Sequence, residues 1–189
     1  MLSRAPVLTV PDVFSADECR TLIELFNTRG QVLVQASKAI NYFNADYKVP
    51  APDQGRRDRV DHFFHEKATV QFLLRRMLRV EQEVARAFHY RITKHETMRM
   101  ARYEGIRGGF GYGHRDNILP TEYRRFALSI NLNADKFTGG ELRFPEFGET
   151  LYRPPTGAAM VFSSSLLHEV LEVTAGVRFV FLSFMYGDT

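Results

Sequence analysis

Three residues in the second half of the chain could hold one metal ion together. His114 and Asp116 are two positions apart, and residues two apart on a β-strand point to the same face. His168 lies on a later predicted strand, from which we expect it to complete the site from across a barrel. Two imidazoles and one carboxylate on one face of an octahedral ion leave positions free for further ligands, as in non-haem Fe(II) sites.

The other four histidines have positions that are explained without a metal. His62 and His65 lie at a predicted junction between a strand and a helix, and His95 lies within a predicted strand. His89 lies near a helix C-terminus, where a positive charge is favoured. Short matches to metal-ligand spacings arise often by chance, so we expect none of these four to bind the metal.

An arginine follows the second candidate histidine by ten residues. Arg178 lies on a predicted strand with the apolar residues Val177 and Phe179 on either side, so it is either a surface residue of the strand or a buried cation. A buried guanidinium requires a partner, and a carboxylate can accept two parallel hydrogen bonds from it. We therefore expect Arg178 to bind a dicarboxylate ligand at the inner end of a pocket.

Two amphipathic helices are predicted in the first half of the chain. Ser15 and Glu18 form a capping box, and Gly30 suits the residue after a helix end, so the first helix is predicted over 16–29. Apolar residues at helical spacing predict the second helix over 66–89.

The hydrophobic period changes after residue 90 from about 3.6 to about 2, which predicts strands. They are expected at 92–103, 125–132, 141–144, 150–153, 158–162, 167–173 and 177–186. Shorter strands are expected earlier, at 7–10, 31–36 and 59–64. Two helices followed by closely spaced strands predict an α+β, mainly β domain, in which a β-sandwich or barrel carries helices on one face.

Two stretches lack a periodic pattern. Residues 37–55 are rich in Asn, Asp, Pro and Gly, so we predict a long loop. Long loops in compact domains are usually either functional or disordered. Residues 108–111 are rich in glycine and are predicted to form either a mobile lid or a tight connection. Phe110 and Tyr112 would then line the mouth of the site.

Composition indicates an ordinary globular protein. The 189 residues are 44% hydrophobic and 25% charged with a net charge of +3, which suits one domain and does not call for a nucleic-acid partner. Cys19 is the single cysteine, so no internal disulfide forms, and a buried thiol is expected. No apolar run approaches 18 residues, and we expect a cytoplasmic protein without a membrane partner.

The ordered motifs from residue 103 to 186 resemble the prolyl-4-hydroxylase-like branch of the Fe(II)/2-oxoglutarate-dependent dioxygenases. The matching segments are Tyr103-Glu104-Gly105, His114-Arg115-Asp116, Ile130-Asn131-Leu132-Asn133, Gly139-Gly140-Glu141-Leu142-Arg143-Phe144-Pro145, Pro155-Thr156-Gly157, His168-Glu169-Val170 and Gly176-Val177-Arg178. The resemblance extends to the two helices and is weakest over 37–55.

The resemblance implies a double-stranded β-helix, or jelly-roll, with two supporting N-terminal helices. It implies a single domain over 1–189, with helical support and a substrate loop in 1–90 and the β-helix core in 91–189. It assigns His114, Asp116 and His168 to the iron, and Arg178 to the distal carboxylate of 2-oxoglutarate. Tyr103 is expected in the cosubstrate pocket. Asn131 stands where many prolyl hydroxylases have a second tyrosine that contacts the cosubstrate.

The activity implied by the resemblance is hydroxylation of an unactivated C–H bond with Fe(II), 2-oxoglutarate and O2, releasing succinate and CO2. Ascorbate is expected to support it. Asp116 favours hydroxylation over halogenation, because related halogenases have a small residue at this position. The substrate is expected to be an amino acid, a peptidyl residue or a related small molecule, and its recognition is expected to involve residues 37–59.

Other readings remain open from the sequence. A cupin-like enzyme with zinc or manganese could use the same three ligands without needing Arg178. The domain could instead modify a protein as a regulatory or oxygen-sensing module. Nucleic-acid demethylation would require a strongly basic face, and the net charge of +3 does not favour it.

The group Arg56, Arg57 and Arg59 could bind a substrate carboxylate or form a surface ion-pair cluster. The oligomeric state stays open, with a homodimer among the options.

Overall fold

The computed structural model describes residues 4–29, 32–35, 58–104 and 111–187. Several predictions from the sequence lie outside these residues or concern side chains that are not described. They are the loop over 37–55, the glycine-rich segment at 108–110, Gly30 as the helix-ending residue, the side chains of Arg56 and Arg57, and Phe110 and Tyr112 at the mouth of the site.

The first helix, α1 (Ala16–Thr28), begins as its capping box predicts. The Ser15 side chain accepts a hydrogen bond from the Glu18 amide, and the Glu18 carboxylate accepts one from the Ser15 amide. These two bonds satisfy amide groups that lack partners within the helix. Cys19, Leu22 and Phe26 form its buried side, as the helical spacing predicted.

The second helix, α2 (Lys67–Phe88), is longer and is capped at both ends. The Glu66 carboxylate accepts hydrogen bonds from the amides of Ala68 and Thr69, and His89 ends the helix in a left-handed conformation with φ 51°. Its buried residues recur every three or four positions; they are Leu73, Met77, Val80 and Val84. Both predicted helices are confirmed, with ends within about one residue of the expected positions.

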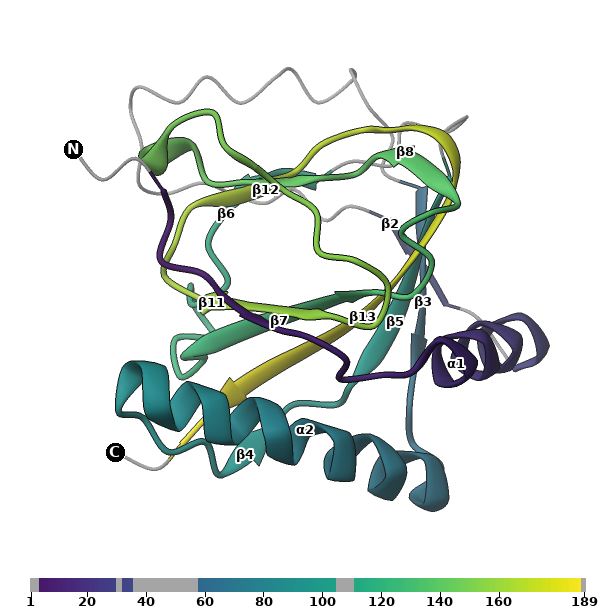
Figure 1. The fold of residues 1–189 in the computed structure, drawn as a ribbon, viewed down its shortest axis with the longest axis horizontal. Coiled ribbons are helices and arrows are strands. Elements are labelled where there is room, and N and C mark those ends of the chain that lie inside the picture. Colours follow the sequence, from purple (N-terminus) through teal and green to yellow (C-terminus); the bar gives the residue numbers. More distant parts are fainter. Residues whose placement is uncertain (1–3, 30–31, 36–57, 105–110, 188–189) are drawn as a thin grey trace.

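Two antiparallel sheets face each other, with both helices on the outer side of the larger one (Figure 1). The larger sheet has the order β1 (Leu8–Val10), β11 (Ala159–Ser163), β7 (Phe126–Asn131), β13 (Val173–Tyr186), β5 (Arg99–Glu104), β3 (Asp58–Phe63) and β2 (Val32–Gln35). Two short strands, β4 (Lys94–His95) and β8 (Phe137–Gly139), also pair with β13. The smaller sheet has the order β10 (Leu151–Tyr152), β9 (Leu142–Arg143), β12 (His168–Val170) and β6 (Gly111–His114).

Several strands differ from their predicted extent. The predicted strand over 92–103 is divided into β4 and β5, because His95 pairs with Met185 while Arg99 pairs with Leu182. Three residues on one strand therefore face two on the other, and such a bulge leaves no mark on the hydrophobic pattern. β8 was not among the predicted strands, and β6 includes only His114 of the extended segment expected to carry His114 and Asp116. β13 begins at residue 173 instead of 177.

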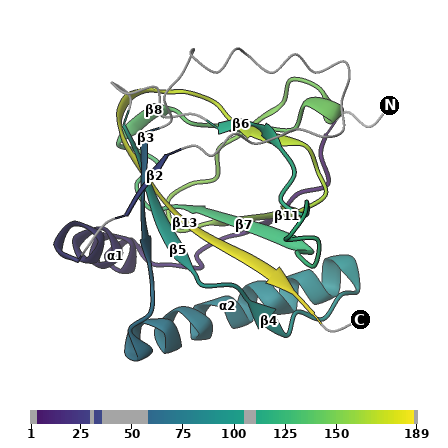
Figure 2. The ribbon, with the colours of Figure 1, turned by 180° about the vertical axis from the view of Figure 1, so that it is seen from behind.

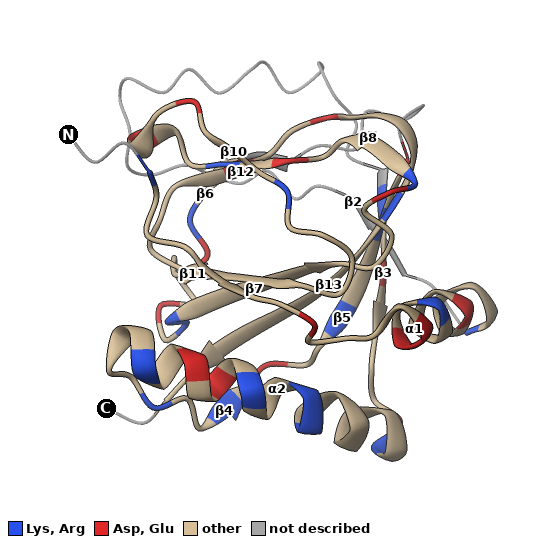
Figure 3. Cartoon of the chain, viewed as in Figure 1, with Lys and Arg blue, Asp and Glu red and all other residues tan. Residues whose placement is uncertain are grey.

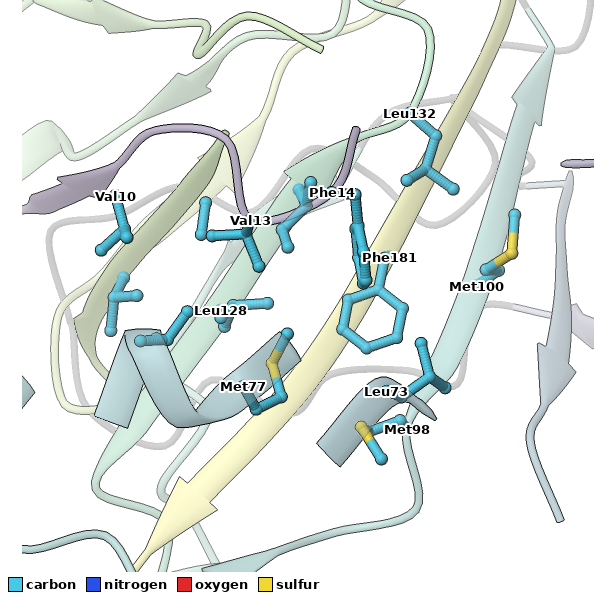
Figure 4. Close-up of a cluster of buried hydrophobic side chains, with 14 of the residues drawn as sticks. Val10, Val13, Phe14, Leu73, Met77, Met98, Met100, Leu128, Leu132 and Phe181 are labelled. Atoms are coloured by element: carbon cyan, nitrogen blue, oxygen red, sulfur yellow. The ribbon is translucent and has the colours of Figure 1, made fainter. Parts of the chain in front are cut away.

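Alternate residues of the large sheet face two different environments. On β13, Phe179, Phe181 and Met185 belong to the core under the helices, whereas Val180 faces the space between the sheets with Tyr103 and Phe137. Figure 4 shows the core beneath α2, where the labelled Phe14, Leu73, Met77 and Phe181 side chains converge. The rings of Phe14 and Phe181 meet edge to face at 5.2 Å.

Strand β13 runs through the middle of the large sheet, between β7 and β5 (Figure 2). Because its outer face is covered by the helices, its inner face can carry polar residues into the space between the sheets. Strands β1, β2 and β3 from the first 90 residues join the same sheet, so the helical part and the strand-rich part share one layer.

Both helices carry acidic and basic residues, and charged residues are scattered over the strands (Figure 3). This distribution agrees with the modest net charge of +3. No helix among the described residues is long and apolar enough to cross a membrane.

The single cysteine provides a test of the packing under α1. Cys19 is buried, and burial together with the nearby Glu18 charge raises the pKa of its thiol to about 11. At pH 8 about one thiol in a thousand would then be ionised. We expect a colorimetric disulfide reagent to label the native protein at least ~100-fold more slowly than the guanidinium-unfolded protein. Native labelling within tenfold of the unfolded rate would contradict this packing.

Candidate metal centre

The two candidate histidines lie side by side on neighbouring strands. β6 and β12 are antiparallel partners, and their register places His168 directly opposite His114. Side chains of such a pair point to the same face of the sheet, and the two ring centroids are 4.4 Å apart. The prediction that His168 completes the site from across a barrel is therefore wrong, because both histidines come from the smaller sheet.

Asp116 reaches the histidines from a turn. β6 ends at His114, so the prediction that one strand carries both residues is also wrong. The Asp116 amide donates to the Ser164 carbonyl at 2.9 Å, and its carbonyl accepts from the Thr121 hydroxyl at 2.8 Å. These contacts hold the backbone in a position from which the carboxylate turns back toward both imidazoles.

The three side chains bring their ligand atoms to one point. Asp116 Oδ1 lies 3.5 Å from His114 Nε2, and Asp116 Oδ2 lies 3.4 Å from His168 Nε2. Bonds from a metal to histidine nitrogen or carboxylate oxygen measure about 2.0–2.2 Å, so one ion can be shared at these separations. In the described part of the chain, no other group of three such residues gathers its ligand atoms this closely.

The protonation states suit a cation. Burial lowers the pKa of His168 to about 4, although the Asp116 charge opposes this. Burial works against ionisation of Asp116, but His168, His114 and Arg124 outweigh it and lower the pKa of Asp116 to about 2. At neutral pH the site therefore offers a neutral His168 imidazole and a carboxylate, which are the forms that bind metals.

The orientation of His168 is fixed by its neighbours. Its Nδ1 lies 3.0 Å from the Leu166 carbonyl, so the proton belongs on Nδ1 and the lone pair of Nε2 faces Asp116. The ring also packs against Phe162 with centroids 4.7 Å apart. His114 keeps 30% of its side chain exposed, so the cluster is open on the His114 side.

Arg178 lies on the inner face of β13 and is buried. Its Nε donates to Asn131 Oδ1 at 3.0 Å, and its guanidinium lies 5.4 Å from the centre of the Tyr103 ring. Among the described residues, no carboxylate forms an ion pair with Arg178. Burial disfavours the charged form and lowers the pKa of this guanidinium. A buried cation without an anion is costly, so the residue fits the carboxylate of a bound ligand.

Tyr103 stands opposite Arg178 in the register of β5 and β13. Its hydroxyl oxygen accepts a hydrogen bond from Arg59 Nη1 at 3.3 Å. The hydroxyl hydrogen is therefore free to be donated to another acceptor. Tyr103 and Arg178 thus present two donors to the same space.

Comparison with known proteins agrees with this geometry. The family model described as the 2OG-Fe(II) oxygenase superfamily, where 2OG is 2-oxoglutarate, matches residues 98–186. These residues are similar to that superfamily. The matched segment contains the three clustered ligands, Asn131 and Arg178. The resemblance to this family predicted from the sequence is confirmed.

The chain is also similar to particular hydroxylases. It is 38% identical over 76 residues to a PKHD-type hydroxylase of Prochlorococcus marinus, a match that covers 38% of this chain. The chain spans about a third (34%) of the length of that relative. A prolyl-4-hydroxylase of Pseudomonas putida has a TM-score of 0.67 at 20% identity, covering 100% of this chain and 96% of the other. The viral collagen prolyl hydroxylase from Paramecium Bursaria Chlorella virus-1 has a TM-score of 0.66 at 20% identity, covering 96% of each chain.

These solved structures establish the fold. The jelly-roll core with two supporting helices, predicted from the sequence, is confirmed. The superfamily uses Fe(II) and 2-oxoglutarate, and the donor set of two imidazoles and one carboxylate fits the iron. Arg178 fits the distal carboxylate of the cosubstrate, because its charge is buried and lacks an ion pair among the described residues.

Asn131 lies beside Arg178. Its Oδ1 accepts from Arg178, and its Nδ2 donates to the Pro154 carbonyl at 3.1 Å. The amide therefore orients the Arg178 guanidinium. Direct contact between Asn131 and the cosubstrate stays a prediction.

The two glycines of the Gly139-Gly140 motif allow close packing. Both have positive φ, 77° and 70°, which favours glycine. A Cβ atom on Gly140 would lie 2.9 Å from Cδ of Arg178 and 3.1 Å from Cγ2 of Val173. The second glycine therefore leaves room for the arginine.

Sequence reasoning missed several supporting residues. For Arg59 the sequence left substrate binding and a surface ion-pair cluster both open, and did not indicate that it lies beside Tyr103 on the inner face of the large sheet. Thr121 and Ser164, which hold the Asp116 backbone, carried no signal in the sequence. Their roles depend on a turn whose shape appears only in three dimensions.

Removal of a metal ligand tests the site directly. We expect His168→Ala and Asp116→Ala to weaken anaerobic Fe(II) binding at least ~100-fold, because losing an outer partner of a ligand alone costs about 10- to 100-fold. The measurement is the iron content after equilibrium dialysis, with His65→Ala as the exposed control. Either variant binding iron as tightly as the control would contradict the assignment.

Proposed function

We propose that this chain is an Fe(II)- and 2-oxoglutarate-dependent dioxygenase that hydroxylates an unactivated C–H bond and releases succinate and CO2. The observation that carries the proposal is one arrangement. Two histidines on the smaller sheet and one aspartate on the turn after β6 gather their ligand atoms, and a buried arginine without an ion pair among the described residues lies on the inner face of the larger sheet. The proposed substrates are amino acids, peptidyl residues or related small molecules.

Bound together, Fe(II), 2-oxoglutarate and O2 would supply the oxidising chemistry, and the protein would supply position and surroundings. His114, Asp116 and His168 would hold the iron and leave three of its positions to other ligands. Asp116 supports hydroxylation over halogenation, since its carboxylate occupies a ligand position that halide would need. We also propose that ascorbate supports turnover by keeping the iron reduced.

Arg178 and Tyr103 would hold the distal carboxylate of 2-oxoglutarate. The guanidinium can donate two parallel hydrogen bonds to a carboxylate, and the Tyr103 hydroxyl hydrogen is available for a third. Asn131 fixes the rotation of the guanidinium by accepting from its Nε. The rings of Tyr103 and Phe137, 5.4 and 5.9 Å from the guanidinium carbon, limit the access of water to this end.

The cupin-like alternative is not favoured. A metalloenzyme that does not use 2-oxoglutarate has no need for the buried charge of Arg178, and residues 98–186 match the oxygenase superfamily. A role as a module that modifies a protein requires the same chemistry and differs only in its substrate.

The cosubstrate assignment is tested by removing the arginine charge. We expect Arg178→Met to raise the Kd for 2-oxoglutarate ~100-fold, since hydrogen bonds to a charged group contribute about 1.5–3 kcal/mol. Iron affinity should stay within about threefold of wild type, because Arg178 is not among the metal-binding side chains. Calorimetric titration with 2-oxoglutarate, using Mn(II) in place of Fe(II), measures the first quantity.

Arg125→Met is the matched control for this test. Arg125 is an exposed arginine directly before β7, the strand that pairs with β13. Wild-type protein that forms no succinate from 2-oxoglutarate, with or without added substrates, would overturn the proposed function. So would an Arg178→Met variant that binds 2-oxoglutarate as the control does.

The glycine next to Arg178 gives an independent test. We expect Gly140→Ala to displace the arginine and to raise the Kd for 2-oxoglutarate ~10-fold, a change of about 1.4 kcal/mol. Gly148→Ala is the control, because Gly148 also has positive φ, 99°, but a Cβ there would meet no atom within 4 Å. Both variants should lose stability by about 1 kcal/mol through backbone strain. Equal 2-oxoglutarate affinity in the two variants would contradict the packing argument.

A further inference from the structure

Two arginines share one carboxylate on the inner face of the large sheet, beside the proposed cosubstrate site. We propose that Arg99, supported by Arg59 and Asp61, binds a carboxylate group of the substrate. The substrate would then be a molecule with a free carboxylate, such as an amino acid, in preference to an uncharged segment within a peptide. This inference rests on the proposed function and names the class of substrate.

The register of β3 and β5 puts these residues on the inner face. Arg59 pairs with Tyr103, Asp61 with Ala101, and Phe63 with Arg99. Ala101 and Tyr103 belong to the cluster between the sheets, and alternate residues of a strand share a face. The intervening residues Val60 and Met100 contact the core under the helices. The two arginines and the aspartate therefore lie on the same wall as Tyr103.

The carboxylate of this cluster is already engaged by one arginine. Arg59 Nη2 donates to Asp61 Oδ2 at 2.8 Å, and Arg59 Nε lies 2.7 Å from Asp61 Oδ1. Burial opposes the charge on Arg59, but Tyr103 and Asp61 outweigh it and raise the pKa of its guanidinium. Asp61 is fully buried, so an approaching ligand would not meet its negative charge directly.

Arg99 lacks an equivalent partner. Its Nε approaches Asp61 Oδ2 only to 3.5 Å, and among the described residues this nitrogen has no hydrogen-bond acceptor. Burial and the neighbouring Arg59 charge lower the pKa of Arg99. Two positive charges facing one negative charge leave a net charge of +1 on this wall. An additional carboxylate would relieve that excess.

The two arginine side chains of this wall are partly exposed. The side chains of Arg99 and Arg59 retain 18% and 25% of their exposure, while Asp61 retains 1%. The guanidinium of Arg99 also lies 5.1 Å from the ring centre of Phe184 and 5.7 Å from that of Phe63. These rings restrict its motion, which lowers the entropy lost when a ligand binds.

A short chain of contacts links Arg99 to the metal centre. The centre of the Phe184 ring lies 5.1 Å from the guanidinium of Arg99 and 3.7 Å from the guanidinium of Arg124. Arg124 Nη1 donates to the Asp116 carbonyl at 3.4 Å. Arg124 is itself neutralised by Glu96 through two bonds of 2.5 and 2.6 Å. Arg124 therefore has a carboxylate of its own, whereas Arg99 shares Asp61 with Arg59.

A purely structural ion-pair cluster is the competing explanation. It predicts that replacing Arg99 changes stability without changing the preference between charged and neutral substrates. A carboxylate-binding role predicts a loss of that preference. The decisive quantity is therefore the ratio of activities toward an acid and toward its amide, which a structural role would not alter.

The experiment compares the twenty L-amino acids with their carboxamides as probes. Wild-type protein with Fe(II), 2-oxoglutarate and ascorbate is assayed for succinate release above the substrate-free rate and for a mass gain of one oxygen in the probe. We expect at least one acid to stimulate release, with a kcat/KM at least ~10-fold above that of its amide, which corresponds to about 1.4 kcal/mol.

Variants then assign the preference to Arg99. Arg99→Met is expected to lower kcat/KM for the acid ~100-fold and to bring acid and amide within about threefold of each other, with the Kd for 2-oxoglutarate unchanged. Arg99→Lys should retain part of the preference through its charge. Arg102→Met is the matched control, because Arg102 lies on the same strand, faces the other side and pairs with Glu104 at 2.5 Å.

Three results would overturn the inference. They are equal stimulation by acids and amides, no stimulation by any acid, and equal acid preference in Arg99→Met and Arg102→Met. The first two need only wild-type protein, so the inference stays testable if Arg99→Met fails to fold. Failure of the proposed function looks different, because wild-type protein would then neither bind 2-oxoglutarate nor release succinate in the absence of a probe.

Discussion

The alternation of side chains along β13 is the constraint on which the rest of the structure depends. This strand has 14 residues and pairs with β5, β7, β4 and β8. Its outer residues pack beneath the helices, and burial of each large side chain there contributes roughly 2–3 kcal/mol. This burial stabilises the strand and offsets the free-energy cost of placing the buried charge of Arg178 on the opposite face. A shift of the register by one residue would exchange the two faces.

The space between the sheets is arranged for anions at two places. Arg178 lies at one, oriented by Asn131 and flanked by aromatic rings. Arg99 lies at the other, where Asp61 balances only one of two arginines. The metal-binding cluster is itself anionic through Asp116. The positive charges of Arg178 and Arg99 would attract the carboxylates of the cosubstrate and of the proposed substrate into this space.

The metal centre illustrates how a weak sequence signal becomes a defined site. A pair of residues two apart and a single distant histidine have little meaning alone. The antiparallel pairing of β6 with β12 brings the two imidazoles together, and the turn after β6 adds the carboxylate. The hydrogen bond from His168 to the Leu166 carbonyl then directs the remaining nitrogen toward Asp116. Each ligand is thus positioned by backbone contacts of the surrounding strands and turns.

Much of the outline was already determined by the sequence. The capping box at Ser15 and the helical spacing of apolar residues set both helices, because these signals act over a few residues. The order of motifs identified the family, the candidate ligands and Arg178. Tertiary structure decided the rest: which strands pair, the bulge between β4 and β5, and the inward position of Arg59. It also decided that Asp61 lies closer to Arg59 than to Arg99. These features depend on register and on the charges that meet across strands, and neither is encoded in the local pattern of one segment.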